Sequence, residues 1–207
     1  MHIAIRSTES QKKELLTKGF GNKVSVEWFE PYEKLTGTNA DVYFDLTFND
    51  NVPDTNEFII DKPVFVHAVN CVCKEIKPNY IRLNAWEGFL NRPVIEVAYC
   101  NTFKKNVENV LNELEWPYAF VADDYGFIAA RIIAMIINEA YYTLEENVST
   151  KQQIDIAMKL GTNYPYGPFE WSEKIGLQNI LILLKKLSQQ NKRYTISSLL
   201  VHESQQF

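Results

Sequence analysis

The sequence predicts an α/β part followed by an all-α part, in which a trimmed, mainly parallel sheet precedes a helical domain. Short runs rich in Val, Ile, Phe and Tyr alternate with polar, turn-forming segments through the first hundred residues. Such runs are typical of strands covered on both faces in a parallel sheet. Beyond about residue 125 the chain reads as helices. Trp116-Pro117 marks the change, because the residue before a proline disfavours helix. We therefore expect two domains, 1–117 and 118–207.

The first domain is expected to resemble a dinucleotide-binding fold of reduced size. A helix over 10–18, ended by Gly19 and Gly21, separates the first two strands and gives the start of a βαβ unit. A complete Rossmann domain has two βαβαβ halves, and this segment is too short to hold both at normal size. The predicted sheet is therefore Rossmann-like but trimmed. Its strands are expected over 2–6, 24–29, 41–47, 63–69, 80–84 and 93–99.

The second domain is predicted to be mainly helical. A helix over 102–114 and a short strand over 118–121 lead into it. Residues 126–146 form one long helix, apolar nearly all round in its first three turns, which indicates burial in a core or an oligomer interface. Ser149 can cap a helix over 151–160 that Gly161 ends, and a last clear helix covers 175–187.

Composition narrows the partners. The chain has 207 residues, a formal charge of -5 and 46% hydrophobic residues, so it can form a packed core but offers no basic field for nucleic acid or an anionic membrane. No signal peptide is recognisable, and the most apolar stretch is shorter than the roughly 20 residues that span a bilayer. We expect a cytoplasmic protein. Three cysteines (Cys71, Cys73 and Cys100) and three scattered histidines predict no disulfide framework and no metal site.

A series of motifs occupies the helical part. It comprises G-F-I-x-x-R at 126–131, N-E-A at 138–140, I-D-x-A-M-K-x-G at 154–161 and P-x-G-P-F-E at 165–170. In order and spacing the series resembles the C-terminal domain of the 3-hydroxyacyl-CoA dehydrogenase family. Each motif also has a structural interpretation. Gly126 allows a tight helix entry, Asp155 meets its helix dipole, Gly161 permits a C-cap, and Gly167 helps to place Phe169 in the core.

The resemblance implies a dehydrogenase chemistry, in which hydride passes between a 3-hydroxyacyl-CoA and NAD. A histidine acts as base, a glutamate orients it, and an asparagine and a serine hold the substrate oxygen. Residues 93–97 line up with the family's strand that ends in the catalytic glutamate, which places Glu96 at that position. Counting back without gaps places Asn84 at the histidine. Ala130 stands at the asparagine, and 69–72 contain no serine. An amide has no useful basicity, so Glu96 alone is retained, as a relic or paired with Arg82 or Arg92.

The cofactor turn departs from the family as well. A G-x-G-x-x-G turn normally lets a pyrophosphate approach the helix N-terminus. Here residues 6–12 read R-S-T-E-S-Q-K, with no glycine and with Glu9 carrying the wrong charge. We therefore predict no cofactor-binding residues, and no NAD bound in the family's manner.

Three functions follow from these observations. The first is a degenerate relative without NAD-dependent activity. It would be a homodimer through the 126–146 region that binds an acyl-CoA or another metabolite, or that associates with an enzyme of fatty-acid metabolism. The second is an active, NAD-dependent 3-hydroxyacyl-CoA (3-hydroxybutyryl-CoA) dehydrogenase. The third is a different reaction that uses Glu96, His67 or Cys71, for which buried strand residues are the simpler explanation.

Overall fold

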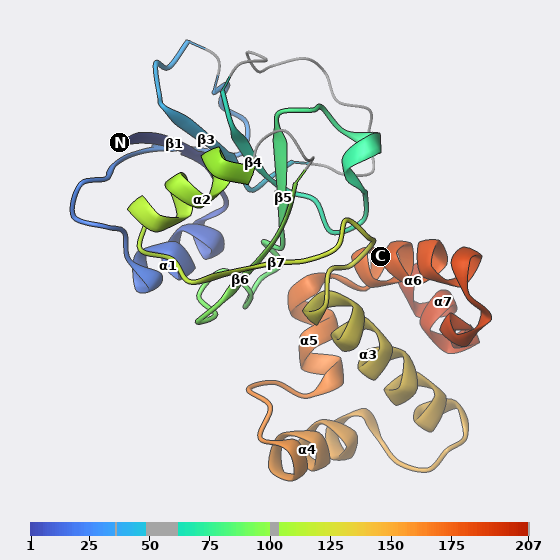
Figure 1. The fold of residues 1–207 in the computed structure, drawn as a ribbon. Coiled ribbons are helices and arrows are strands. Elements are labelled where there is room, and N and C mark those ends of the chain that lie inside the picture. The colour runs from blue at the N-terminus through green and yellow to red at the C-terminus, as the bar shows by residue number, and fades with distance from the viewer. Residues whose placement is uncertain (36, 49–61, 100–103, 207) are drawn as a thin grey trace. The chain divides into compact units, whose positions relative to one another are not determined.

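The computed structural model describes residues 1–35, 37–48, 62–99 and 104–206 (Figure 1). The chain divides into two compact units, Met1–Phe127 and Ile128–Phe207. Among the described residues, no helix is long and apolar enough to cross a membrane.

The first unit is built on a seven-stranded sheet with the order β2-β1-β3-β4-β5-β6-β7. All neighbouring strands are parallel except β5 and β6, which are antiparallel. The predicted Rossmann-like, mainly parallel sheet is confirmed. The strands are β1 (His2–Arg6), β2 (Ser25–Phe29), β3 (Val42–Asp45), β4 (Val64–His67), β5 (Tyr80–Leu83), β6 (Ile95–Tyr99) and β7 (Tyr118–Phe120).

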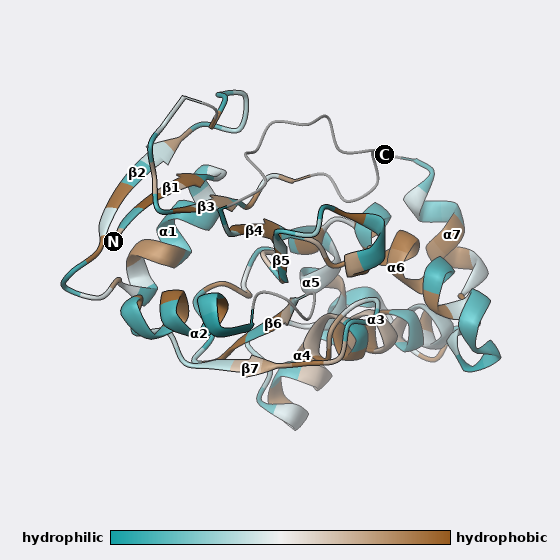
Figure 2. Ribbon diagram, turned by 45° about the horizontal axis from the view of Figure 1, so that its top comes forward, coloured by the Kyte–Doolittle hydropathy of each residue, from teal (hydrophilic) through white to brown (hydrophobic). Residues whose placement is uncertain are grey.

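The two faces of this sheet are covered differently, and the face on which the described residues form no α-helix is where the fold is reduced. Two α-helices of the described part, α1 (Glu9–Lys18) and α2 (Lys104–Glu113), pack on one face through Leu15 and Val107. The other face is covered by residues from connecting segments, among them Leu35 and Ile76. The connection from β4 to β5 contains only the 3-10 turn η1 (Cys73–Glu75). In Figure 2 the strands β1 and β4 are hydrophobic, whereas α1 and α2 carry hydrophilic segments as well.

The change between units lies ten residues later than the predicted boundary of 117/118. Strand β7 continues the sheet because it pairs with β6, with Ile95 opposite Tyr118. The amide of Ile95 donates to the carbonyl of Pro117, and the amide of Val121 donates to the carbonyl of Val97. The short strand after the Trp-Pro step therefore belongs to the first unit.

The second unit is helical, as predicted. Its central helix α3 lies against α4, α5, α6 and α7. Ile137 on α3 and Leu184 on α6 are among the fully buried residues of this unit. Helices α5 and α7 were not predicted. The helices are α3 (Ala129–Glu145), α4 (Lys151–Thr162), α5 (Pro168–Ile175), α6 (Leu177–Gln190) and α7 (Ser198–Ser204), with a 3-10 turn η2 (Lys192–Tyr194).

Several predicted helix ends need correction. Helix α3 begins three residues after Gly126, because Gly126 and Phe127 have positive φ angles of 79° and 50°. The glycine does serve a tight entry, since φ in this region favours glycine. Thr150 rather than Ser149 caps α4, accepting from the amide of Gln153. Helix α4 also runs through Gly161, and its left-handed C-cap is Asn163.

Candidate functional site

The carboxyl ends of β1 and β3 are joined by an ion pair. Arg6 donates to Asp45 through Nε (3.1 Å to Oδ1) and through a terminal nitrogen (2.6 Å to Oδ2). The amide and hydroxyl of Thr47 also donate to Asp45, at 3.2 and 3.0 Å. The carboxylate is buried, at 1% exposure, so it is desolvated and held by charge-assisted hydrogen bonds. The tips of these two strands are thereby fixed to each other.

The N-terminus of α1 satisfies its own backbone donors. Thr8 Oγ1 accepts from the amide of Gln11 at 3.2 Å, and Gln11 Oε1 accepts from the amide of Thr8 at 2.9 Å. This is a capping box, which occupies two groups that a bound anion would otherwise use.

The amide group of Gln11 also crosses the edge of the sheet. Its Nε2 donates to the carbonyls of Leu46, after β3, and Ala85, after β5, at 2.9 and 3.0 Å. Gln11 is buried. In open α/β sheets, ligands bind outside the carboxyl ends of the strands, at the point where strand order reverses. Here β1 lies between β2 and β3, so that point is at this edge, and the Gln11 side chain fills part of it.

The same face of α1 holds the segment that follows β5. Glu14 accepts from the amides of Gly88 and Leu90 at 2.7 and 3.0 Å, and Lys18 Nζ donates to the carbonyl of Arg92 at 2.6 Å. Burial lowers the pKa of Lys18. Positions 11, 14 and 18 share one helix face. Helix α1 therefore anchors residues 85–92 at three points.

Two of the predicted site positions lie at the same end of neighbouring strands. Asn84 directly follows β5, and Glu96 is the second residue of β6. The last pair of the antiparallel register is Leu83 opposite Val97, the residues next to them in the sequence.

The surroundings of Asn84 are those of a buried amide. The residue is 6% exposed, and its Oδ1 accepts from the amide of Trp86 at 3.0 Å. Among the described residues, its Nδ2 has no hydrogen-bond partner, and neither does Trp86 Nε1. An amide in this position can donate or accept a hydrogen bond but offers no basic nitrogen.

Ala130, the third predicted position, is fully buried in the first turn of α3 and so belongs to the other unit. Its methyl side chain can contribute packing only, because it has no hydrogen-bonding group. The side chain at position 130 therefore cannot hold a substrate oxygen, the role that the resemblance implies for an asparagine there.

Arg82, one of the two cations considered as a partner for Glu96, is engaged by residues 68, 123 and 124. The Arg82 side chain is fully buried and donates to Asp123 at 2.5 Å, to the carbonyl of Ala68 at 3.0 Å and to that of Asp124 at 3.1 Å. Its guanidinium also lies 4.7 Å from the ring centre of Phe127. Arg82 therefore ties β5 to residues 122–127, a structural role that the sequence did not reveal.

His67, considered as a base for a different reaction, is held by the backbone. Its Nδ1 accepts from the amide of Ala85 at 3.0 Å, which places the ring proton of the neutral form on Nε2. Cys71 is buried. Cys100 lies outside the described residues. Among the described residues, no group of three or more metal-binding side chains gathers.

In the helical unit, two of the sequence motifs contact each other. Asp155 accepts from the amide of Phe169 at 2.8 Å, so it caps α5 and not its own helix, where it is the fifth residue. Burial raises the pKa of Asp155, and the Phe169 amide partly offsets this effect. Glu170 accepts from the amide of Gly167 and pairs with Lys159 at 2.5 Å, and these contacts lower its pKa, Lys159 most of all. The two motifs therefore lock α4 to α5.

The N-E-A motif has a structural role of the same kind. Asn138 is buried, donates to the carbonyl of Thr195 at 2.8 Å and accepts from the amide of Ser197 at 3.0 Å. Glu145, one turn after the motif, accepts from the amide of Leu199 and from two serine hydroxyls at the start of α7. These bonds lower the pKa of Glu145, the one from Leu199 most strongly.

Comparison with known proteins bears on this helical unit. Residues 126–203 match the model of the 3-hydroxyacyl-CoA dehydrogenase C-terminal domain. Over 82 residues, 39% of the chain, the sequence is 48% identical to a 3-hydroxyadipyl-CoA dehydrogenase of Escherichia coli. Over 68 residues, 32% of the chain, it is 46% identical to a 3-hydroxybutyryl-CoA dehydrogenase of Bradyrhizobium diazoefficiens.

The helical unit is therefore similar to the C-terminal domain of 3-hydroxyacyl-CoA dehydrogenases. The sequence matches cover only 17% and 23% of the lengths of these two relatives. The fold extends further. The crystal structure of (S)-3-hydroxybutyryl-CoA dehydrogenase PaaH1 from Ralstonia eutropha aligns with a TM-score of 0.69 and 16% identity. It covers 97% of this chain and 92% of that one. At 16% identity, this alignment shows only that the sheet unit shares the fold of that enzyme.

Proposed function

We propose that this chain is a degenerate 3-hydroxyacyl-CoA dehydrogenase relative without NAD-dependent activity. It would act in the cytoplasm as a dimeric protein that binds an acyl-CoA or related metabolite, or that associates with another protein of fatty-acid metabolism. The observation that carries the proposal is the turn between β1 and α1, where Gln11 occupies the edge of the sheet.

The turn does not fit a pyrophosphate held in the family's manner. Such a group needs glycines that let its oxygens reach backbone donors at the helix start. The turn contains no glycine, and Thr8 and Gln11 already satisfy each other's amides. A pyrophosphate here would have to displace the buried Gln11 amide and approach the Glu9 carboxylate. Both steps oppose binding.

The position of the proton acceptor supports the same conclusion. Removing a positioned general base costs about 10²- to 10⁴-fold in rate. Asn84 has no basic group, and His67 Nδ1 is engaged by a backbone amide. With Asn84 in place of the histidine, Glu96 would have no imidazole to orient.

Exposed apolar residues on the helical unit support the dimer. Ile128 and Ile132, one helical turn apart, are 54% and 50% exposed, and Leu160 on α4 is 83% exposed. Exposed apolar side chains on neighbouring turns of one helix, such as Ile128 and Ile132, are a feature of contact surfaces. We expect Ile132→Asp to shift a dimer toward monomer in sedimentation velocity, while Lys192→Asp, an exposed change at η2, leaves it unchanged. A monomeric wild-type chain would refute the dimer.

Titration calorimetry with NADH and, separately, with acetoacetyl-CoA tests the function, followed by NADH oxidation with both ligands present. Binding of acetoacetyl-CoA without NADH binding or turnover is the expected result. The names of the two relatives favour an active dehydrogenase as the alternative. Turnover that Glu96→Gln abolishes would establish that alternative and overturn the proposal. If neither ligand binds, the acyl-CoA part is wrong, and the proteins that co-purify with the chain become the question.

A further inference from the structure

We propose that the helical unit has a second ligand pocket, which binds a small primary amine with an apolar body. A cavity of about 410 Å³ opens between the ends of its helices. Ligand sites have volumes of about 300–1,000 Å³ and combine mostly apolar walls with a few polar groups. All residues that line this cavity belong to the second unit, so the pocket is independent of the carboxyl edge of the sheet.

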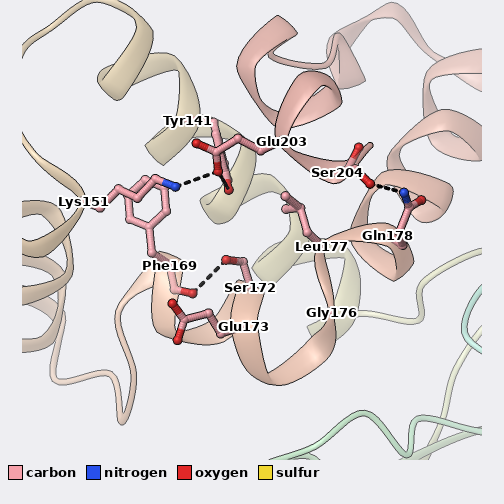
Figure 3. A pocket seen from close by; sticks show the side chains of 10 residues that line it. All are labelled: Tyr141, Lys151, Phe169, Ser172, Glu173, Gly176, Leu177, Gln178, Glu203 and Ser204. Atoms are coloured by element: carbon pink, nitrogen blue, oxygen red, sulfur yellow. Dashed lines mark hydrogen bonds and ion pairs between the residues drawn. The ribbon is translucent and has the colours of Figure 1, made fainter. Parts of the chain in front are cut away.

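The apolar walls come from three helices. Tyr141 lies on α3, Phe169 on α5, and Leu177 is the first residue of α6 (Figure 3). The rings of Tyr141 and Phe169 meet edge to face with their centres 5.1 Å apart. The two rings are buried, and Leu177 is half-buried, so these walls offer apolar contact to an alkyl or aryl group.

The polar groups form a network on one side of the pocket. Lys151 Nζ pairs with Glu203 Oε2 at 2.6 Å, and the Tyr141 hydroxyl donates to the same oxygen at 2.8 Å (Figure 3). Burial raises the pKa of Tyr141, and the bond to Glu203 adds to this, so the hydroxyl remains a donor. Among the described residues, no hydrogen bond reaches Glu203 Oε1. This oxygen is therefore available to a ligand that donates.

Charge selects the class of ligand. The lining holds one ammonium, of Lys151, and two carboxylates, of Glu173 and Glu203, which leaves one negative charge. Since Lys151 is already paired with Glu203, the residual charge resides on the Glu173 side. An ammonium head group complements this balance, whereas a carboxylate would be repelled. Lys151 Nζ already lies 5.6 and 5.4 Å from the ring centres of Tyr141 and Phe169, so the rings serve the apolar body of a ligand. The excess carboxylate therefore favours an alkyl- or arylammonium ion over a fatty acid.

The test compares three six-carbon probes of equal length, n-hexylammonium, 1-hexanol and hexanoate, by titration calorimetry and by amide NMR shifts of the full chain at pH 7. We expect hexylammonium to bind, hexanol to bind more weakly and hexanoate not to bind. The shifted amides should include Ser172 and Leu177. Tighter binding of hexanoate, or failure of hexylammonium to bind, would overturn the proposal.

Variants localise the site. Leu177→Trp fills the pocket and should abolish hexylammonium binding, and Glu173→Gln should weaken it about five-fold through the lost charge. Glu146→Gln removes an exposed carboxylate outside the lining and should leave binding unchanged. Because Glu173 is exposed, its variant tests the charge even if Leu177→Trp does not fold. Equal loss in Glu173→Gln and Glu146→Gln would refute the site.

Discussion

The substitution Gly167→Ala gives the most decisive test of how the helical unit is held together. A Cβ atom on Gly167 would lie 2.3 Å from Asp155 Oδ1, 2.4 Å from its Cβ and 2.5 Å from its Cα. The Gly167 backbone, with φ −74° and ψ 168°, is open to any residue. The cost must therefore come from the forced separation of α4 and α5 and not from backbone strain.

The magnitude follows from two effects. Overpacking of a tight core contact costs about 1–3 kcal/mol. Moving Asp155 also weakens its 2.8 Å hydrogen bond to the Phe169 amide, and a hydrogen bond to a charged group contributes about 1.5–3 kcal/mol. Together we expect Gly167→Ala to lose about 2–5 kcal/mol of unfolding free energy. Truncating Asp155 to alanine would not rescue it, because the added methyl group would still collide with the first side-chain carbon and the backbone at position 155.

Gly161→Ala is the matched control. A Cβ atom on Gly161 would meet nothing within 4 Å, and the residue lies inside α4. Alanine in a helix is favoured over glycine by up to about 1 kcal/mol. Urea unfolding followed by circular dichroism should therefore show the two glycine-to-alanine changes moving the midpoint in opposite directions. Midpoints that agree within error would refute the steric account of the α4–α5 contact.

Three further predictions concern other contacts. Gln11→Met should lose about 2–3 kcal/mol, because two buried carbonyls lose their donor, and urea unfolding measures it. It should not create NADH binding, and tight NADH binding by the variant would contradict the interpretation of the turn. Asp123→Asn should cost about 1.5–3 kcal/mol by weakening the charge-assisted hydrogen bond to Arg82, and an unchanged melting temperature would contradict this. Glu145→Gln should destabilise the helical unit at pH 7 by about 1 kcal/mol, since Glu145 caps α7. Because the pKa of Glu145 is lowered by folding, its contribution is present above the ordinary value of 4.5 and is lost as the pH falls below it. The melting temperatures of the two proteins should therefore move closer together as the pH is lowered below 4.5.

The fold was predictable where local pattern decides it. The apolar runs located each strand, from His2–Arg6 to Tyr118–Phe120, to within a few residues. Helix α5 was missed although its signal was present, since Pro168 stands at the first helical position, where proline is favoured. Helix α7 also had a sequence signal in Ser197, its N-cap.

The candidate site was predictable only in part, because its contacts join residues far apart in the chain. The positions of Asn84 and Glu96 could be mapped by counting residues, and they stay a prediction. The bridge from Gln11 to Ala85 spans 74 positions, and that from Arg82 to Asp123 spans 41. No periodicity or local motif indicates such pairs. For the same reason, Asp155 was expected to act at the start of its own helix, whereas it accepts from an amide at the start of α5.

At the N-terminal turn, which lacks the family's glycines, the residues that are present make contacts within the chain. The first turn of α1 carries the Thr8–Gln11 box and the Gln11 bridge, and the next two turns hold residues 88–92 through Glu14 and Lys18. A helix that binds a cofactor at its N-terminus keeps its amides and the adjoining sheet edge open. Here α1 uses both for contacts within the chain. Under the proposed function, restoring a histidine at position 84 alone would therefore not restore NAD binding, because the contacts that oppose it lie in α1 and not after β5.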